Sequence, residues 1–139
     1  MKKELTTAQM LGICLGDFAR AILSGLIVTY TLKFFNVTPS SGLPLLIPAG
    51  MMGTLRGIGV IFDALTDPWV AGLSDNCKAK GGRRLPFMKW AAIPYAAVCL
   101  LIFFPPKGEL SNINIVWVAA MLLLYYLFST LYNVPFNAL

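Results

Sequence analysis

Long apolar runs, separated by short polar stretches, dominate the pattern along the chain. Four runs are long enough for the roughly 20 residues that a helix needs to cross a bilayer. They cover residues 8–35, 45–73, 86–104 and 113–139. Proline and glycine mark two of the separations, at residues 39–42 and 105–108. The pattern therefore predicts an all-α integral membrane protein with four transmembrane helices.

The composition agrees with a membrane location. Hydrophobic residues make up 58% of the 139 residues and charged residues only 12%, with a mean hydropathy of +0.73. A soluble domain carries about 45–50% apolar and about 25% charged residues. The net charge of +5 does not indicate nucleic-acid binding, because no basic stripe with interleaved aromatic residues is present. We expect the lipid bilayer as a partner, and no nucleic acid.

The residues that usually hold cofactors are scarce. The sequence contains no histidine, which excludes a histidine-containing metal site. Its three cysteines, Cys14, Cys77 and Cys99, are widely spaced, so no disulfide framework is predicted. We expect no cofactor and no resident metal.

Basic residues gather on one side of the predicted membrane. An even number of crossings separates the N-terminus from the loop at about residues 74–85. Seven of the eleven basic residues lie in the N-terminus, in this loop or just after it: Lys2, Lys3, Lys78, Lys80, Arg83, Arg84 and Lys89. Such residues flank transmembrane helices on the cytoplasmic side. We therefore expect the N-terminus and this loop in the cytoplasm.

Five charged residues interrupt the first two predicted helices. Each would cost at least about 2.5–3.5 kcal/mol at the centre of a bilayer, so we expect them to face a protein interior or a water-filled cavity. Asp17 and Arg20 are neighbours on the first helix, and Arg56, Asp63 and Asp67 share one face of the second. Counted from the cytoplasmic side, Asp17 and Asp63 reach a similar depth. This predicts a polar cluster between the first two helices.

Two carboxylates on one helix face suit a hard monovalent cation or a proton taken from a water-filled cavity. The alternative is a salt-bridge network that only fixes helix packing. Gly53 and Gly57 have the spacing that permits close approach of helices, and we interpret them as packing residues. Asn133 and Asn137 share a face around Pro135, which fits either a polar cavity wall or a kink satisfied by neighbouring helices.

Three blocks of sequence carry a family resemblance. The first is Gly-Asp-Phe at residues 16–18, and the third is Tyr-Asn-Val-Pro-Phe-Asn-Ala-Leu at residues 132–139. The second is Asp-Ala-Leu-Thr-Asp-Pro at residues 63–68, followed by Gly72, Asp75 and Gly-Arg-Arg-Leu-Pro at residues 82–86. Their order and spacing resemble the glycoside–pentoside–hexuronide:cation symporters, the melibiose-carrier family of the major facilitator superfamily. The resemblance covers essentially the whole chain and implies the first four helices of a twelve-helix fold in a bacterial inner membrane.

The resemblance also implies roles for individual residues. The acids that match Asp63 and Asp67 line the coupling-cation site of the melibiose carrier, and the acid that matches Asp17 contacts sugar. The position of Asn133 holds a third acid in that carrier, shared between cation and sugar, and the position of Asn137 holds an aromatic residue that stacks on the sugar. The melibiose-type sugar contacts are therefore not all present.

The sequence contains two further groups of candidate residues, a pair of arginines and a loop motif. Arg20 and Arg56 lie outside the family pattern, and as partners of the intramembrane acids they would reduce or replace the need for Na⁺. The loop block resembles the cytoplasmic motif that pairs acids and arginines to hold the closed-inside form. That gating motif is matched by Gly72, Asp75, Gly82, Arg83 and Arg84.

The function implied by the resemblance is secondary transport of a sugar or glycoside, coupled to Na⁺ or H⁺, and not an enzymatic reaction. A carrier of this superfamily has two six-helix halves. We therefore expect residues 1–139 to be a partial N-terminal transmembrane domain, inactive alone, whose partners are the missing C-terminal helices of the same protein.

Two alternatives remain open at this point. One is a small four-helix membrane protein with a binding or assembly role. The other is a Mg²⁺-dependent membrane transferase that uses Asp63, Asp67 and Asp75, although the sequence lacks the further Asp residues, with a Gly-x-x-Ala-Arg run at a set spacing from them, that such enzymes need. Transport that responds to a Na⁺ or H⁺ gradient would favour the carrier, and Mg²⁺-dependent activity would favour the enzyme.

Overall fold

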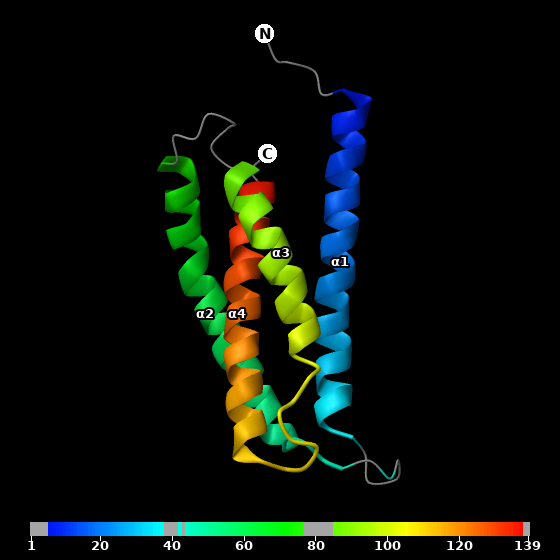
Figure 1. Ribbon diagram of the computed structural model, residues 1–139. Coiled ribbons are helices and arrows are strands. Elements are labelled where there is room, and N and C mark those ends of the chain that lie inside the picture. The colour runs from blue at the N-terminus through cyan, green and yellow to red at the C-terminus, as the bar shows by residue number, and fades with distance from the viewer. Residues whose placement is uncertain (1–5, 38–41, 43, 77–84, 138–139) are drawn as a thin grey trace.

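A computed structural model of the 139-residue chain describes residues 6–37, 42, 44–76 and 85–137. Within these ranges the chain forms four α-helices: α1 (Thr7–Phe35), α2 (Ala49–Asn76), α3 (Leu85–Leu101) and α4 (Asn112–Asn137). Consecutive helices run in opposite directions, so the start of α1, the end of α2 and the end of α4 lie at the same end of the molecule (Figure 1). The expectation of an all-α fold with four helices is confirmed.

Proline shifts two helix boundaries from the positions expected from hydropathy. α2 begins at Ala49 rather than near residue 45, because Pro48 restricts the residue before it to extended backbone. The carbonyl of Pro48 then accepts the N–H groups of Met51 and Met52 at 3.0 and 3.2 Å. α3 ends at Leu101, and Phe103 and Phe104 follow in tighter turns before Pro105 and Pro106.

The fourth helix forms the centre of the structure. α4 packs along both α2 and α3, whereas α1 stands at the side and contacts the other helices more sparsely (Figure 1). The α3–α4 interface is aromatic: the ring of Tyr95 stacks on Tyr125 with centroids 5.6 Å apart and on Tyr132 at 6.3 Å. Around these rings lies a buried apolar cluster made chiefly of Val98, Cys99, Ile102, Val118 and Leu122.

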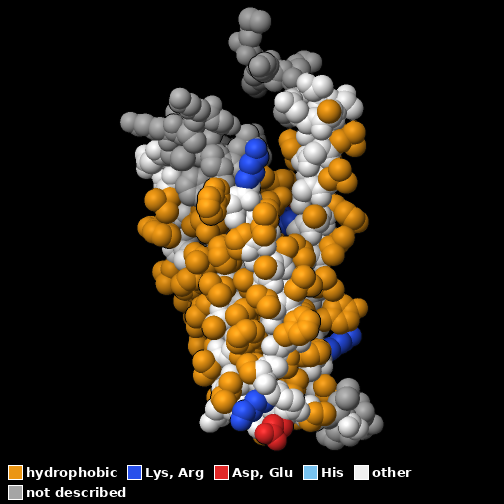
Figure 2. Space-filling model, viewed as in Figure 1, with side chains coloured by type: hydrophobic (Ala, Val, Ile, Leu, Met, Phe, Trp, Pro, Cys, Tyr) orange, Lys and Arg blue, Asp and Glu red, His pale blue; other side chains and the backbone are white. Residues whose placement is uncertain are grey.

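Much of the remaining surface is apolar. Figure 2 shows hydrophobic side chains covering most of the visible face, with few charged groups among them. On α1, Leu15 and Phe18 are each 65% exposed. By length and composition, α1 and α4 are each able to cross a membrane. Water would strongly disfavour so much exposed apolar surface, so these faces belong against lipid or other transmembrane helices.

Among the described glycines, Gly59 permits the closest approach between two helices. A Cβ added at Gly59 of α2 would lie 2.6 Å from Cδ2 of Tyr126 on α4 and closer still to Cε2. Nothing lies within 4 Å of a Cβ added at Gly53 or Gly57. The interpretation of Gly53 and Gly57 as packing residues is therefore wrong within the described structure, and Gly59 has that role.

One buried asparagine organises the connection between α3 and α4. The side chain of Asn114 is fully buried and donates through Nδ2 to the carbonyls of Lys107 and Glu109 at 2.9 and 2.8 Å. Its Oδ1 accepts the N–H of Lys107 at 3.2 Å. The Asn114 side chain thus supplies hydrogen-bond partners to backbone groups that have no backbone partner within this short connection.

We expect Asn114→Ala to lower the free energy of unfolding by about 1–3 kcal/mol, because three hydrogen bonds to the connection are lost at once. Loss of helicity on titration with sodium dodecyl sulfate in mixed micelles, followed by circular dichroism, measures this. Asn112→Ala is the matched control, since Asn112 is exposed two residues earlier. Equal midpoints for the two variants would contradict the prediction.

Candidate functional site

A polar pocket opens where α1, α2 and α4 meet. Its volume is about 400 Å³, within the range of about 300–1,000 Å³ that small-molecule sites usually occupy. Charged, amide and hydroxyl groups share the wall with two tyrosine rings and aliphatic side chains. The lining consists of Ser24, Ile27, Val28, Arg56, Val60, Asp63, Leu122, Tyr125, Tyr126, Ser129 and Asn133.

The carboxylate of Asp63 is held by a hydroxyl from the facing helix. Thr130 on α4 donates through Oγ1 to Oδ1 of Asp63 at 2.6 Å. The same hydroxyl lies 3.0 Å from the carbonyl of Tyr126, and Thr66 of α2 lies 3.5 Å away. A short hydrogen bond to an ionised acceptor is among the stronger neutral-to-charged contacts. It orients the carboxylate and leaves its second oxygen for another partner.

The two intramembrane arginines have different partners from one another. Arg20 pairs with Asp17 one turn earlier on α1, with Nη2 2.6 Å and Nε 2.9 Å from Oδ1. Arg56 instead donates through Nη2 to the carbonyls of Ile27 and Val28 on α1, at 2.8 and 2.7 Å. Among the described residues, no ion pair joins Arg56 to Asp63 or Asp67.

Asn133 lines the pocket and has one buried acceptor without a partner. Its Nδ2 donates to Oγ of Ser129 at 2.9 Å, one turn earlier on α4. Its Oδ1 is buried and has no hydrogen-bond partner among the described residues. A buried carbonyl oxygen without a partner is uncommon in proteins.

The other expected site residues lie outside this pocket. Asp17 is 53% exposed on α1, where it bonds to Arg20. More residues of α4 than of α1 therefore line the polar pocket. Asp67 is exposed one turn beyond Asp63, and Asn137 is exposed at the end of α4. Close by, Gly16 brings α1 against α4: a Cβ added there would lie 3.1 Å from Oη of Tyr132.

The expected gating motif is only partly described. Gly72 and Asp75 lie exposed in the last turns of α2, where Nδ2 of Asn76 donates to the carbonyl of Gly72 at 2.8 Å. Gly82, Arg83 and Arg84 lie outside the described residues.

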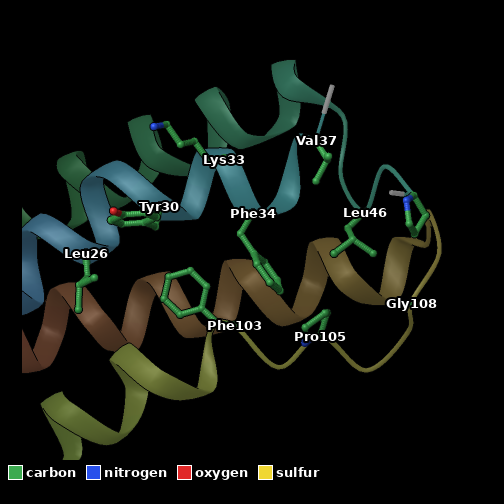
Figure 3. A pocket seen from close by; sticks show the side chains of 10 residues that line it. Leu26, Tyr30, Lys33, Phe34, Val37, Leu46, Phe103, Pro105 and Gly108 are labelled. Carbon is green, nitrogen blue, oxygen red and sulfur yellow. The ribbon is translucent and has the colours of Figure 1, made fainter. Parts of the chain in front are cut away.

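A larger cavity lies at the C-terminal end of α1, and few polar groups line it. It measures about 830 Å³ and is lined almost entirely by apolar side chains from the end of α1 and the two nearby connections. The rings of Phe34 and Phe103 meet edge to face at 5.4 Å, and Lys33 extends away from them (Figure 3). With one charged residue and no carboxylate in its wall, this cavity is not a candidate site for cation-coupled chemistry.

Comparison with known proteins decides the class of molecule. The family model described as MFS/sugar transport protein matches residues 12–139. The chain belongs to this family. The match places the chain in a membrane transporter family of the major facilitator superfamily, and it speaks against the Mg²⁺-dependent transferase because these relatives are symporters and not enzymes.

Individual relatives agree with the family. YagG of Escherichia coli (strain K12), whose name assigns it provisionally as a glycoside/cation symporter, is 33% identical over 98% of this chain. The inner membrane symporter YicJ of the same organism is 30% identical over 100% of the chain. The isoprimeverose transporter of Lactiplantibacillus pentosus is 28% identical over 84% of it. No solved structure matches the chain significantly.

The chain is short beside these relatives. It spans 28% of the length of YagG, 29% of YicJ and 23% of the isoprimeverose transporter. The comparison therefore concerns only the corresponding part of each relative.

Several pocket residues of this chain are not among the site residues that the sequence predicts. They are Ser24, Tyr125, Tyr126 and Ser129, and the sequence does not single out Thr130 as the partner of Asp63 either. A signal was available, because Tyr126, Ser129 and Asn133 recur at helical spacing along one face of α4. What that spacing does not give is the partner of each hydroxyl across the helix interface.

Proposed function

We propose that this chain binds a coupling cation and a sugar or glycoside as part of a Na⁺- or H⁺-coupled symporter. The observation that carries the proposal is the pocket in which the carboxylate of Asp63 and the unpartnered Oδ1 of Asn133 lie on facing helices. A carboxylate oxygen suits a hard cation or a proton, and an amide oxygen accepts a sugar hydroxyl. The printed names of YagG and the isoprimeverose transporter support the substrate class.

The coupling ion belongs at Asp63 in this proposal. Intramembrane acids in transporters mark ion pathways and proton relays. An ionised carboxylate is retained inside a membrane only where it has a functional role or is paired with another group. Asp63 is oriented by Thr130 and reaches no arginine within salt-bridge distance among the described residues. Asp67, one turn away on α2, extends the same acidic face toward the end of the helix.

We assign more of the substrate contacts to residues of α4 than to residues of α1. Asn133 contributes the free acceptor, and the rings of Tyr125 and Tyr126 offer apolar faces to a sugar ring. Asp17 and Asn137 join the site only if the helices move, because both lie outside the pocket in this arrangement. Such movement is ordinary for carriers that alternate between two openings.

We also propose a cytoplasmic location for the N-terminus and for residues 74–85, with Gly72, Asp75, Gly82, Arg83 and Arg84 as the gating motif. The charge distribution supports this orientation, since most basic residues belong to these segments. The helix directions support it as well, because the start of α1 and the end of α2 share one end of the bundle (Figure 1).

The decisive experiment measures uptake of radiolabelled glycosides into membrane vesicles from cells that express the natural gene. We expect accumulation that increases when a Na⁺ gradient or a pH gradient is imposed, and that disappears when an ionophore collapses the gradient. Vesicles from cells without the gene are the control. Uptake that is indifferent to both gradients would refute cation coupling and favour a small membrane protein with a binding or assembly role.

A further inference from the structure

Two opposite charges share the polar pocket without forming an ion pair. Arg56 and Asp63 both line it, two turns apart on one face of α2. Asp63 accepts the hydroxyl of Thr130 on α4, whereas Arg56 donates to two backbone carbonyls of α1. Together the two charged side chains carry no net charge. A cation that binds to Asp63 therefore leaves the pocket with one positive charge in excess, at Arg56.

The guanidinium of Arg56 keeps three N–H donors for a further ligand. Both of its hydrogen bonds come from Nη2, which donates to the carbonyls of Ile27 and Val28. A guanidinium has five N–H groups, so those on Nε and Nη1 remain. In the described part of the chain, neither of these nitrogens has a hydrogen-bond partner. Because Nη2 is anchored to α1, the planar group is held in place at the wall of the pocket.

A serine on α1 adds another donor to the same pocket. Ser24 lines it and lies one turn before the two carbonyls that hold Arg56. Its Oγ accepts the hydroxyl of Tyr125 at 3.4 Å. Among the described residues, no acceptor takes the hydrogen of the Ser24 hydroxyl itself. Hydroxyl and guanidinium donors from two helices thus line one pocket, and N–H and O–H donors are the groups that bind an anion.

The surroundings of these donors favour a small anion with a single charge. Val28 and Val60 line the same pocket, so a strongly hydrated dianion such as sulfate would lose much of its hydration there. A dianion would also exceed the single positive charge of Arg56 and leave an unpaired charge in a low-dielectric region. A halide matches the charge of the guanidinium one for one.

We propose that Arg56 and Ser24 form a chloride site in this pocket, which fills together with the cation site at Asp63. The halide lies against Nε and Nη1 of Arg56 and accepts the hydroxyl of Ser24. Binding of both ions adds no net charge to the pocket, so each ion raises the affinity for the other. The chloride site stands on the donors themselves, and only its link to the cation rests on the proposed function.

The first test measures chloride binding by the purified product of the natural gene in lipid nanodiscs. The observable is broadening of the chlorine nuclear magnetic resonance signal above that of empty nanodiscs. We expect broadening that bromide reverses by competition and that sulfate leaves unchanged. Arg56→Gln should abolish the bromide-sensitive part. Ser24→Ala should weaken chloride binding by about tenfold, as loss of one hydrogen bond to a charged group implies.

The matched control for these variants is Lys33→Gln. It removes a positive charge from α1 outside the polar pocket, and it should leave chloride binding unchanged. Arg56→Lys keeps the charge without the planar group, so weaker binding that bromide still displaces should remain. If the wild-type protein shows no bromide-sensitive broadening, or if Arg56→Gln retains it, Arg56 only clamps α2 to α1 and the inference is overturned.

Circular dichroism separates loss of the site from loss of the fold. Glutamine keeps N–H groups that donate to the carbonyls of α1, so we expect Arg56→Gln to retain the helix content of the wild type. If that variant loses its helices, Ser24→Ala decides the question. Chloride binding of unchanged affinity in Ser24→Ala would then overturn the site.

Transport assays test the link between the two ions and keep the two proposals apart. In membrane vesicles, gradient-stimulated glycoside uptake should fall several-fold when isethionate replaces chloride, and bromide should restore it. Cation-coupled uptake that is indifferent to chloride would overturn the link between the ions. Chloride binding without any gradient-stimulated uptake would refute the proposed function and support the chloride site.

Discussion

Replacing Asp63 by asparagine abolishes cation-stimulated uptake while leaving the helices in place. The amide has nearly the shape of the carboxylate and still offers an oxygen to the hydroxyl of Thr130, so the contact between α2 and α4 is kept. It lacks the negative charge that attracts a hard cation, and it cannot take up a proton in the relevant range. The measurement is uptake with and without an imposed Na⁺ or pH gradient in vesicles from cells that express the variant gene.

The matched control for this change is Glu109→Gln, which removes an exposed acid from the connection before α4. It should leave gradient-stimulated uptake unchanged. Asp67→Asn should act in the same direction as Asp63→Asn, because Asp67 continues the acidic face of α2. Uptake with unaltered cation dependence in both aspartate variants would refute the assignment of the cation site.

Replacing Gly59 by alanine destabilises the packing of α2 on α4, and the expected decrease in the free energy of unfolding is about 1–3 kcal/mol. The added methyl group would overlap the ring of Tyr126, which is rigid and flanked by Tyr125. The ring must turn or the helices must separate, and either response also disturbs the pocket that Tyr126 lines. Titration with sodium dodecyl sulfate in mixed micelles measures the change.

Gly57→Ala is the matched control and should have the opposite sign. No described atom lies within 4 Å of its added Cβ, so only the intrinsic preference of alanine for helix remains. That preference stabilises a helix by up to about 1 kcal/mol. Equal unfolding midpoints for Gly59→Ala and Gly57→Ala would show that the contact with Tyr126 does not limit stability.

The contrast between these glycines shows where sequence reasoning ended. Gly53 and Gly57 have the familiar four-residue spacing, but that spacing does not say which face of α2 meets its neighbour. Gly59 lies two residues beyond Gly57, roughly 200° around the helix, and that is the face on which α4 packs. The choice between faces depends on the position of α4, which the local pattern of α2 does not encode.

The four helices themselves were predictable, because apolar runs of this length have few alternatives in a membrane protein. Grouping Arg56 with Asp63 was predictable too, since a spacing of seven residues places both on one helix face. The partners were not. The arginine donates to backbone carbonyls of α1, and every residue has such a carbonyl, so no residue type in the sequence announces this contact.

The weight of α4 in the site was also hidden from the sequence. The charges of the first two helices predicted a cluster between them, whereas Ser129 and Asn133 of α4 line the facing wall and Thr130 donates to Asp63. Hydroxyl residues are common in transmembrane helices and often bond to their own backbone, as Thr31 does to the carbonyl of Ile27. Only the position of α4 against α2 turns Thr130 into a partner of Asp63.

The bonds from Arg56 to the carbonyls of Ile27 and Val28 bear on how the chain enters the bilayer during synthesis. α2 contains an arginine and three aspartates, so it leaves a protein-conducting channel for lipid less readily than α1 does. α1 is synthesised first, and its carbonyls are already at the depth where the arginine arrives. The hairpin of α1 and α2 is thus the smallest piece of the nascent chain in which that guanidinium has its acceptors, which favours insertion of the two helices as a pair.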